Sequence, residues 1–220
     1  MQKLEDPAPK QQIGEQTHPI WRVERWISLP KRFPVPNVDL FGVLEERRSG
    51  RNFKEIQTTE LSALLWYTQR RVYIDRTNTD KTYGPTATAG ALASVRTLIV
   101  DRSNGTWLYD GLTHRAGVIA GNPDVTAEIV GEANNILDLG NGSLLLFAAD
   151  RLHVERYYFN PESLVLREAG VITGAMALVS TALGLTFCPL GTQATSWVMA
   201  LLGVGEEVIV PGGAAVVGGR

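Results

Sequence analysis

The segment 160–191, NPESLVLREAGVITGAMALVSTALGLTFCPLG, contains the helix around which the rest of the chain can be organised. Asn160 stands where an N-cap is expected, and Pro161 occupies the first helical position, which suits its fixed backbone angle. Gly184 provides the usual end of a helix. The residues between them are apolar on nearly every side: Leu164, Leu166, Val171, Ile172, Met176, Leu178, Val179 and Leu183. Such a helix either lies at the centre of a protein or spans a membrane.

The polar residues of this helix favour a position inside the protein. About 20 weakly polar residues would be long enough to cross a bilayer. However, Thr173, Ser180 and Thr181 lower the hydrophobicity, and the charged pair Arg167-Glu168 lies in the first turns. No second segment of this kind occurs in the chain. We therefore expect a buried central helix and no membrane partner.

The patterns on either side of this helix predict both helices and short strands. Helices are predicted over 37–50 with Asn37 as N-cap, from residue 58 or 59 onward, over 124–139 and over 196–202. Short apolar runs, several rich in branched side chains, predict strands over 95–101, 106–109, 143–149 and 207–217. One wholly apolar helix among such elements predicts an α+β fold in which a sheet packs on buried helices.

The first 36 residues differ in composition from the predicted domain at 37–220. They hold seven prolines or glycines, together with Trp21, Trp26, Ile27 and Leu29. The prolines exclude a long helix, whereas a disordered tail seldom contains two tryptophans. One interpretation is an extended arm that packs on the surface of this chain or of a partner. The other is a loose leader with local contacts.

The composition is ordinary for a globular domain. The 220 residues are 44% hydrophobic and 20% charged, with a formal net charge of -2 at pH 7. This charge gives no general attraction to nucleic acid, so we expect no nucleic-acid partner. Cys188 is the only cysteine, which excludes an internal disulfide and favours a reducing compartment. Residues 1–17 contain no hydrophobic run of the kind that secretion requires, and we expect a cytoplasmic protein.

Several well-known site motifs are missing from the sequence. No G-x-G-x-x-G follows a predicted strand, no Walker-type loop occurs, and no G-x-S-x-G elbow supports a hydrolase triad. His18, His114 and His153 have no partner at a metal-ligand spacing. We therefore expect no dinucleotide fingerprint and no metal site.

Three arginines lie within five residues at the predicted end of the first helix, in Arg47-Arg48-Ser49-Gly50-Arg51. Guanidinium groups can hold a phosphate dianion through bidentate, charge-assisted hydrogen bonds, and they can stabilise negative charge on a reduced flavin ring. The alternative is that cations simply suit the negative C-terminal end of a helix. These residues alone leave both interpretations open.

Two further motifs follow the arginine cluster in a fixed order. Thr88-Ala89-Gly90-Ala91-Leu92 precedes the apolar run 95–101, and Glu168-Ala169-Gly170 lies on the helix that leads to Cys188-Pro189-Leu190-Gly191. Together the three motifs resemble the nitroreductase-like flavoproteins, and within them the SagB-type, or McbC-like, dehydrogenases. The resemblance covers roughly residues 38–220. It implies the nitroreductase-like fold with a central mixed sheet, a homodimer, and FMN bound at the subunit interface.

The resemblance implies a phosphate-binding role for the arginine cluster. Arg47, Ser49 and Arg51 match the positions that bind the FMN phosphate and the ring edge, and Arg48 is their usual neighbour. Arg220, the last residue of a terminal Gly-Gly-Arg, matches a terminal arginine that can reach the phosphate.

The other two motifs are implied to contact the flavin ring. Thr88, Ala89 and Gly90 would approach it from the partner subunit, because small residues let backbone come close to a planar ring. Leu190 and Gly191 would offer backbone N–H groups toward the flavin N5.

Arg156-Tyr157 falls where azoline-oxidising relatives carry a Lys-Tyr pair. The resemblance therefore implies that Tyr157 takes or relays a proton, with Arg156 in the place of the lysine. Arginine is a poorer proton carrier because its pKa lies above about 12. The alternative is a cation and an aromatic side chain that merely precede a helix. Other departures from the family pattern are Ala93-Ser94 in place of Tyr-Pro, and Arg96 in place of a glutamate.

Three functions follow as expectations. The first is an FMN-dependent dehydrogenase that oxidises an azoline or similar intermediate of a peptide or other natural product, working with a cyclodehydratase partner. The second is an NAD(P)H-dependent reductase of nitro or quinone compounds. The third is a non-catalytic docking subunit whose flavin site has degenerated.

Overall fold

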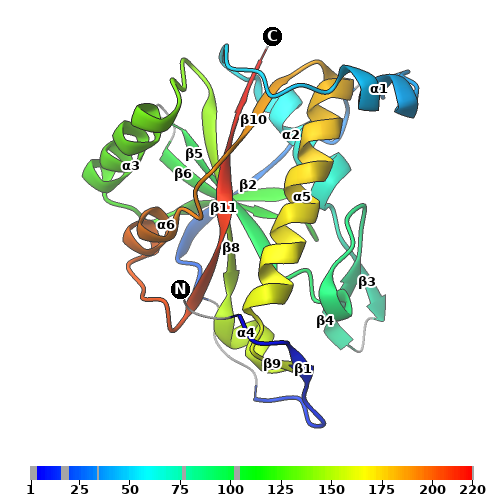
Figure 1. The fold of residues 1–220 in the computed structure, drawn as a ribbon, viewed down its shortest axis with the longest axis vertical. Coiled ribbons are helices and arrows are strands. Elements are labelled where there is room, and N and C mark those ends of the chain that lie inside the picture. The colour runs from blue at the N-terminus through cyan, green and yellow to red at the C-terminus, as the bar shows by residue number, and fades with distance from the viewer. Residues whose placement is uncertain (1–3, 16–19, 34, 76–77, 102–104, 220) are drawn as a thin grey trace.

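The computed structural model describes residues 4–15, 20–33, 35–75, 78–101 and 105–219, and Figure 1 shows their arrangement. A seven-stranded sheet forms the centre, in the order β10-β11-β8-β5-β6-β7-β2. Every pairing in it is antiparallel, so the sheet is not mixed as expected. Its strands are β2 (Val23–Ser28), β5 (Val95–Asp101), β6 (Gly105–Asp110), β7 (Arg115–Ile119), β8 (Ser143–Asp150), β10 (Thr186–Leu190) and β11 (Ile209–Gly218).

The remaining elements lie around this sheet. Two small two-stranded sheets pair β1 (Ala8–Pro9) with β9 (Tyr158–Phe159), and β3 (Val72–Asp75) with β4 (Asn78–Tyr83). The helices are α1 (Leu40–Glu46), α2 (Thr58–Gln69), α3 (Pro123–Ile136), α4 (Arg151–Glu155), α5 (Glu162–Leu183) and α6 (Thr195–Leu202), with one 3₁₀ turn, η1 (Ala89–Ala91).

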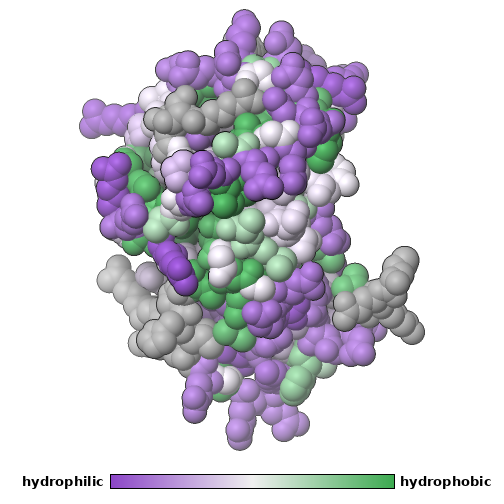
Figure 2. Space-filling view, turned by 90° about the vertical axis from the view of Figure 1, so that its left-hand side faces the viewer, coloured by the Kyte–Doolittle hydropathy of each residue, from purple (hydrophilic) through white to green (hydrophobic). Residues whose placement is uncertain are grey.

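The core has two layers because helices cover both faces of the sheet. In β8, Leu145 and Phe147 belong to a cluster with residues of α2 and α5, whereas Leu144 and Leu146 belong to a cluster with residues of α3 and α6. Strands that are buried on both faces read as continuous apolar runs, which is why the run 143–149 predicted this strand. Figure 2 shows the side of the molecule that carries α3 and α6, where a patch of apolar and weakly polar surface is surrounded by polar residues.

Helix α5 buries one face and leaves another exposed. It contacts β10 and β11, and its buried apolar residues recur every three or four positions: Val165, Ala169, Ile172 and Met176. Gly170 and Gly174 are exposed, and Val171 is 43% exposed. Among the described helices, α5 is the one that is long and apolar enough to cross a membrane, a property that core helices share. The sequence predicted a helix enclosed on all sides, but in one chain the enclosure is incomplete.

Two helix starts differ from the sequence-based predictions. Helix α1 is capped by Asp39, whose Oδ2 accepts from Gly42 N at 2.9 Å, and not by Asn37. Pro161 is the cap of α5, and Asn160 precedes it with a left-handed φ of 51°. Asparagine tolerates this conformation better than most residues, so Asn160 can turn the chain from β9 into α5.

The N-terminal segment is extended and takes part in two sheets. β1 pairs with β9, and β2 pairs with β7 at the edge of the central sheet. Leu29, which follows β2, is buried in the cluster that contains α2 and α5. Part of the segment 1–36 therefore packs against the rest of the chain, and β2 is itself a strand of the central sheet.

Candidate functional site

The arginine segment lies where β10 begins and β11 ends. Gly50 N donates to Phe187 O at 3.1 Å, and a Cβ added at Gly50 would lie 2.6 Å from Thr186 Cγ2, so a larger residue has no room there. Gly219, which follows β11, donates to Lys54 O at 3.0 Å. The segment is thus fixed against the same end of both strands.

The side chains of this segment differ in what they contact. Arg48 Nη1 donates to the carbonyl oxygens of Glu45 at 2.7 Å and Arg47 at 2.8 Å. For Arg48, the structure therefore supports the alternative in which the cation interacts with the C-terminal end of a helix, because its side chain donates to carbonyl groups at the end of α1. The side chains of Arg47, Ser49 and Arg51 make no hydrogen bond or ion pair within the described part of the chain.

Two guanidinium groups and a hydroxyl are consequently available to a ligand at this end of the sheet. Arg51 and Ser49 are exposed, and Arg47 is half-buried. Arg220, which the sequence also assigned to the phosphate, lies outside the described residues.

Leu190 and Gly191 lie at the opposite end of β10, the edge strand of the sheet. Leu190 pairs with Ala214, and Gly191 is exposed with no atom within 4 Å of an added Cβ. Four residue steps along a strand place this end about 13 Å from Thr186. Between the two ends, Cys188 is buried, as expected for a small apolar side chain.

The residues Thr88, Ala89 and Gly90 lie beside the strand that follows Tyr157. Ala89 and Gly90 belong to η1, where Gly90 has a φ of 58°. A Cβ added at Gly90 would lie 2.5 Å from the Tyr158 hydroxyl oxygen. Glycine is required here both for its backbone conformation and for space.

Asp80, which the sequence did not single out, joins Arg156 and Tyr157. Its Oδ2 accepts from Arg156 Nη1 at 2.9 Å and also from the Tyr157 hydroxyl. The Arg156 guanidinium lies 5.4 Å from the centre of the Tyr157 ring. Asp80 belongs to β4, a short polar strand that carries no local signal of a site.

The pKa values of this group set the direction of the hydrogen bond. Burial, followed by the hydrogen bond to Asp80, raises the pKa of Tyr157 to about 12. Partial burial acts to raise the pKa of Asp80, but the Tyr157 hydrogen bond and the Arg156 charge outweigh it and lower that pKa. At neutral pH the tyrosine is a donor and the aspartate is an ionised acceptor. The two shifts keep the proton on Tyr157, and the ionised Asp80 orients the Tyr157 hydroxyl.

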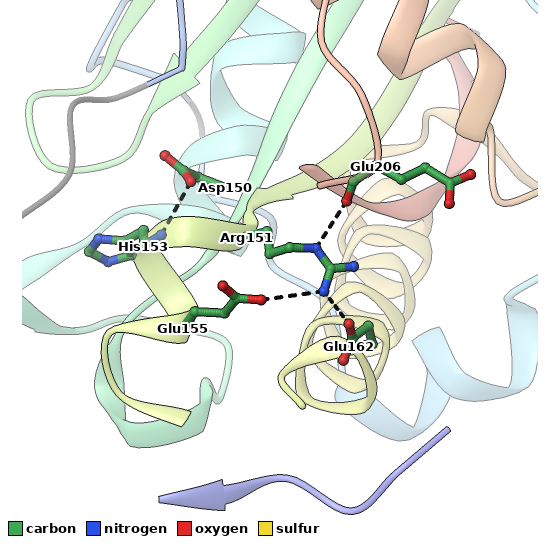
Figure 3. A network of polar contacts seen from close by, with 6 residues as sticks. All are labelled: Asp150, Arg151, His153, Glu155, Glu162 and Glu206. Carbon is green, nitrogen blue, oxygen red and sulfur yellow. Dashed lines mark hydrogen bonds and ion pairs between the residues drawn. The ribbon is translucent and has the colours of Figure 1, made fainter. Parts of the chain in front are cut away.

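A network of polar contacts around Arg151 surrounds the turn between α4 and α5, which carries Arg156 and Tyr157 (Figure 3). Arg151 Nε donates to Glu206 O at 3.0 Å, and its Nη1 forms ion pairs with Glu155 at 3.5 Å and with Glu162. These contacts join α4, the start of α5 and the turn before β11. Arg156 and Tyr157 lie between α4 and α5, so the network restricts how the turn that carries them can move.

Glu168 has a structural role that the motif alone did not reveal. It is buried, and its carboxylate accepts from Val95 N at 2.9 Å and from Ser94 Oγ at 3.0 Å. Burial raises the pKa of Glu168 more than these hydrogen bonds lower it. The contacts fasten α5 to the start of β5, directly after the segment that contains Gly90.

The structure separates the predicted site residues into two groups. The arginine segment contacts Phe187, just after the C-terminal end of α5, whereas Arg156 and Tyr157 come just before its N-terminal end and Gly90 of η1 lies against Tyr158. Figure 1 shows α1 and β9 at opposite ends of α5. With 22 residues, α5 is about 33 Å long. One chain therefore does not bring the two groups together.

Neither group lines the larger cavity on the other side of the sheet. That cavity has a volume of about 620 Å³ and lies between α3 and strands β5, β6 and β7. Its walls include Val118, Ile119, Val130 and the buried Thr106.

Comparison with known proteins gives similarity in structure but not in sequence. No model of a protein family matches the chain, and no curated protein matches it. Among solved structures, a protein from Ralstonia eutropha JMP134 with the provisional name nitroreductase is 16% identical, with a TM-score of 0.64 over 97% of this chain and 98% of that chain.

Two further structures indicate the range of proteins with this architecture. A chain of the E. coli microcin synthetase McbBCD complex, solved with truncated pro-MccB17 bound, is 17% identical, with a TM-score of 0.61 over 87% of this chain and 76% of that chain. A provisionally named nitroreductase from Desulfovibrio desulfuricans, solved in complex with FMN, is 16% identical, with a TM-score of 0.54 over 84% of this chain and 87% of that chain. These similarities show that the chain has the α+β fold of the nitroreductase-like proteins.

Proposed function

We propose that this chain is an FMN-dependent oxidoreductase. The observation that supports it most is the position of Arg47, Ser49 and Arg51 at the start of edge strand β10, where their side chains make no hydrogen bond or ion pair with the residues that the structure describes. The fold is shared with a protein that was solved with FMN. No dinucleotide fingerprint is present, which favours a single phosphate.

The groups at the two ends of β10 are of the kinds that could bind the phosphate and the ring of FMN. Guanidinium groups bind phosphate through charge-assisted hydrogen bonds, so Arg47 and Arg51 would hold that end of the cofactor, with Arg220 as a third candidate. At the other end, Gly191 has open space around it, and Leu190 and Gly191 would approach the ring with their backbone. The cofactor, when bound, supplies an acceptor for hydride.

We further propose a homodimer that buries the open face of α5. Gly170 and Gly174 lie on that face, and Leu40, Phe41 and Leu44 of α1 are 60%, 71% and 50% exposed nearby. Large exposed apolar side chains beside small residues are typical of a protein interface. If two α5 helices pack antiparallel, each chain brings its η1 and Tyr157 end alongside the arginine segment of the other. Such a dimer would unite the two groups of site residues.

The reaction we favour is dehydrogenation of an azoline or similar intermediate in a peptide or other natural product, beside a cyclodehydratase partner. The similarity to a chain of McbBCD supports it, as does the Tyr157–Asp80 pair. Such an oxidation removes a hydride and a proton from neighbouring atoms of the substrate. FMN, when bound, would supply the hydride acceptor, and Tyr157 would take or relay the proton, with its hydroxyl oriented by the hydrogen bond that it donates to Asp80.

A reductase of nitro or quinone compounds that uses NAD(P)H is the second candidate, supported by the provisional name of the Ralstonia protein. The two candidate functions are distinguished by mixing the FMN-loaded protein with NADPH in the absence of oxygen and following the absorbance of the flavin. A dehydrogenase of the first kind should keep its oxidised spectrum on the time scale of turnover, whereas a reductase should bleach within it. A protein that contains no flavin and binds no added FMN would instead match the docking subunit and contradict both candidates.

A further inference from the structure

A small cavity lies behind Asp80, between β4, the start of β5 and α4. It has a volume of about 90 Å³, and its walls are formed by Arg71, Asp80, Thr82, Leu92, Ala93, Arg96, Leu112 and His153. A smaller cavity of about 10 Å³ shares Arg71, Ala93 and Arg96 and adds Gln69. Two arginines from separate segments therefore line the same partly open pocket.

Neither arginine has a carboxylate partner in contact. Arg71 is buried, and its guanidinium donates to Thr86 O at 3.0 Å and to Thr86 Oγ1 at 2.8 Å, which are neutral acceptors. Arg96 is half-buried and makes no hydrogen bond or ion pair with any described residue. Burying a guanidinium without a negative partner costs free energy.

Two unpartnered polar atoms line these cavities as well. Thr82 and Gln69 are each only 5% exposed, and Thr82 Oγ1 and Gln69 Nε2 have no hydrogen-bond partner among the described residues. Most buried polar atoms have a partner, so two such atoms beside one pair of arginines are unusual. Two guanidinium groups, an amide N–H and a hydroxyl make a set of donors that several oxygen atoms of one anion could satisfy.

The side chains that line the cavity carry more positive than negative charge, and the carboxylates around it have other partners. Asp80 is occupied by Arg156 and Tyr157, and burial lowers the pKa of His153, which is then neutral at pH 7. Among the residues that line the 90 Å³ cavity, the two arginines thus exceed Asp80 by one positive charge. Glu168 faces both arginines from α5, but its carboxylate is held by Ser94 and Val95. Asp110 and Asp150 also act on the Arg96 charge, but Asp110 accepts from Leu112 N and Thr113 and pairs with Arg115, and Asp150 accepts from His153 N.

We propose that Arg71, Arg96 and Thr82 form a binding site for a small oxyanion, the carboxylate or phosphate group of a ligand. The site adjoins Asp80, so a ligand anchored here by its anionic group would lie beside the Tyr157–Asp80 pair. The site is separate from the arginine segment on β10, so FMN enters the test only to occupy that segment and keep the test anion away from it.

The test measures anion binding to the FMN-saturated protein by calorimetry and thermal unfolding at constant ionic strength. Inorganic phosphate and acetate are compared with chloride. We expect phosphate or acetate to bind saturably and to raise the melting temperature, and the anion that does so identifies the ligand group. If neither binds more tightly than chloride, the proposal fails.

Variants locate the bound anion. Arg96→Gln should weaken its affinity at least about tenfold. Arg47→Ala, in the arginine segment on β10, should leave the affinity unchanged; if Arg47→Ala abolishes binding and Arg96→Gln does not, the anion occupies the proposed flavin site and this inference is overturned.

Thr82→Val decides the question if Arg96→Gln does not fold. Valine matches threonine in size and removes only an unpartnered hydroxyl, so the variant should be as stable as the wild type or more so. We expect its anion affinity to fall about three- to tenfold. Thr106→Val is the matched control, because Thr106 is also buried with an unpartnered hydroxyl but lines the 620 Å³ cavity. Equal affinity in the two variants would contradict the proposed site.

Discussion

At the scale of single residues, Tyr157 and Asp80 are joined by a hydrogen bond whose direction follows from their opposite pKa shifts. Tyr157→Phe removes only the hydroxyl, so FMN affinity should be unchanged. If the chain is a dehydrogenase, flavin reduction by its substrate should slow by about 100-fold, because positioned acid–base groups contribute about 10²–10⁴-fold. Single-turnover reduction followed in a stopped-flow instrument measures this. Equal rates in both proteins would exclude the proton role of Tyr157.

Asp80 should make stability depend on pH at the acid end. Its folded-state pKa lies below the ordinary value of 3.8, so the unfolded chain binds a proton first as the pH falls. The stabilisation by Asp80 is therefore present above pH 3.8 and is lost as the pH falls through the folded-state pKa. Urea unfolding of wild type and Asp80→Asn should differ more at pH 6 than at about pH 3. A difference that does not depend on pH would contradict the ionised contact.

The role of Asp80 could not be predicted from the sequence. Its partners Arg156 and Tyr157 lie 76 and 77 positions away, and nothing in the polar β4 segment indicates the contact. The left-handed φ of Gly90 is a local requirement that a glycine can signal, whereas its close approach to the Tyr158 hydroxyl depends on a residue far along the chain. Arg47 and Arg48 show a limit of sequence-based prediction. The two neighbouring arginines could not be told apart by residue type, yet the Arg48 side chain donates to carbonyl groups at the end of α1, whereas that of Arg47 makes no hydrogen bond or ion pair with the described residues.

At the scale of elements, Glu168 fastens helix α5 to strand β5. Glu168→Ala leaves the buried Val95 N–H and the Ser94 hydroxyl without an acceptor, so the free energy of unfolding should fall by about 2–4 kcal/mol. Arg167→Ala is the control, since Arg167 is exposed and bonds only within its own helix, to Ser163. Chemical denaturation of both variants checks this. A loss below about 0.5 kcal/mol for Glu168→Ala would show that the contact does not anchor the helix.

The elements with strong local patterns were predictable from the sequence. The central helix and the strands β5 and β8 are long enough, and apolar enough, to be recognised without tertiary information. β2 was missed because most of its residues are exposed, so that its sequence VERWIS has no clear apolar alternation. β3 and β4 were missed because they form a polar two-stranded sheet, whose stability comes from its neighbours.

At the scale of the whole molecule, the proposed flavin site is complete only when two chains pack together. Gly170→Leu and Gly174→Leu place large side chains on the open face of α5, where one chain has space for them. Each should shift the protein toward the monomer in analytical ultracentrifugation and lower its FMN affinity, because the interface would be obstructed. Gly131→Leu on α3 is the matched control, with no atom within 4 Å of an added Cβ, and it should remain dimeric. A wild-type protein that is a monomer with bound flavin at micromolar concentration would contradict the architecture.

The most direct test of the central claim is an FMN titration of three proteins, followed by quenching of flavin fluorescence. The wild type should bind one FMN per chain, and Arg47→Ala should bind it about 10- to 100-fold more weakly, since a hydrogen bond to a charged group contributes about 1.5–3 kcal/mol. Arg48→Ala should bind nearly as the wild type, because Arg48 contacts the end of α1. Equal affinity of Arg47→Ala and wild type, or no saturable binding by the wild type, would contradict the flavin site on β10.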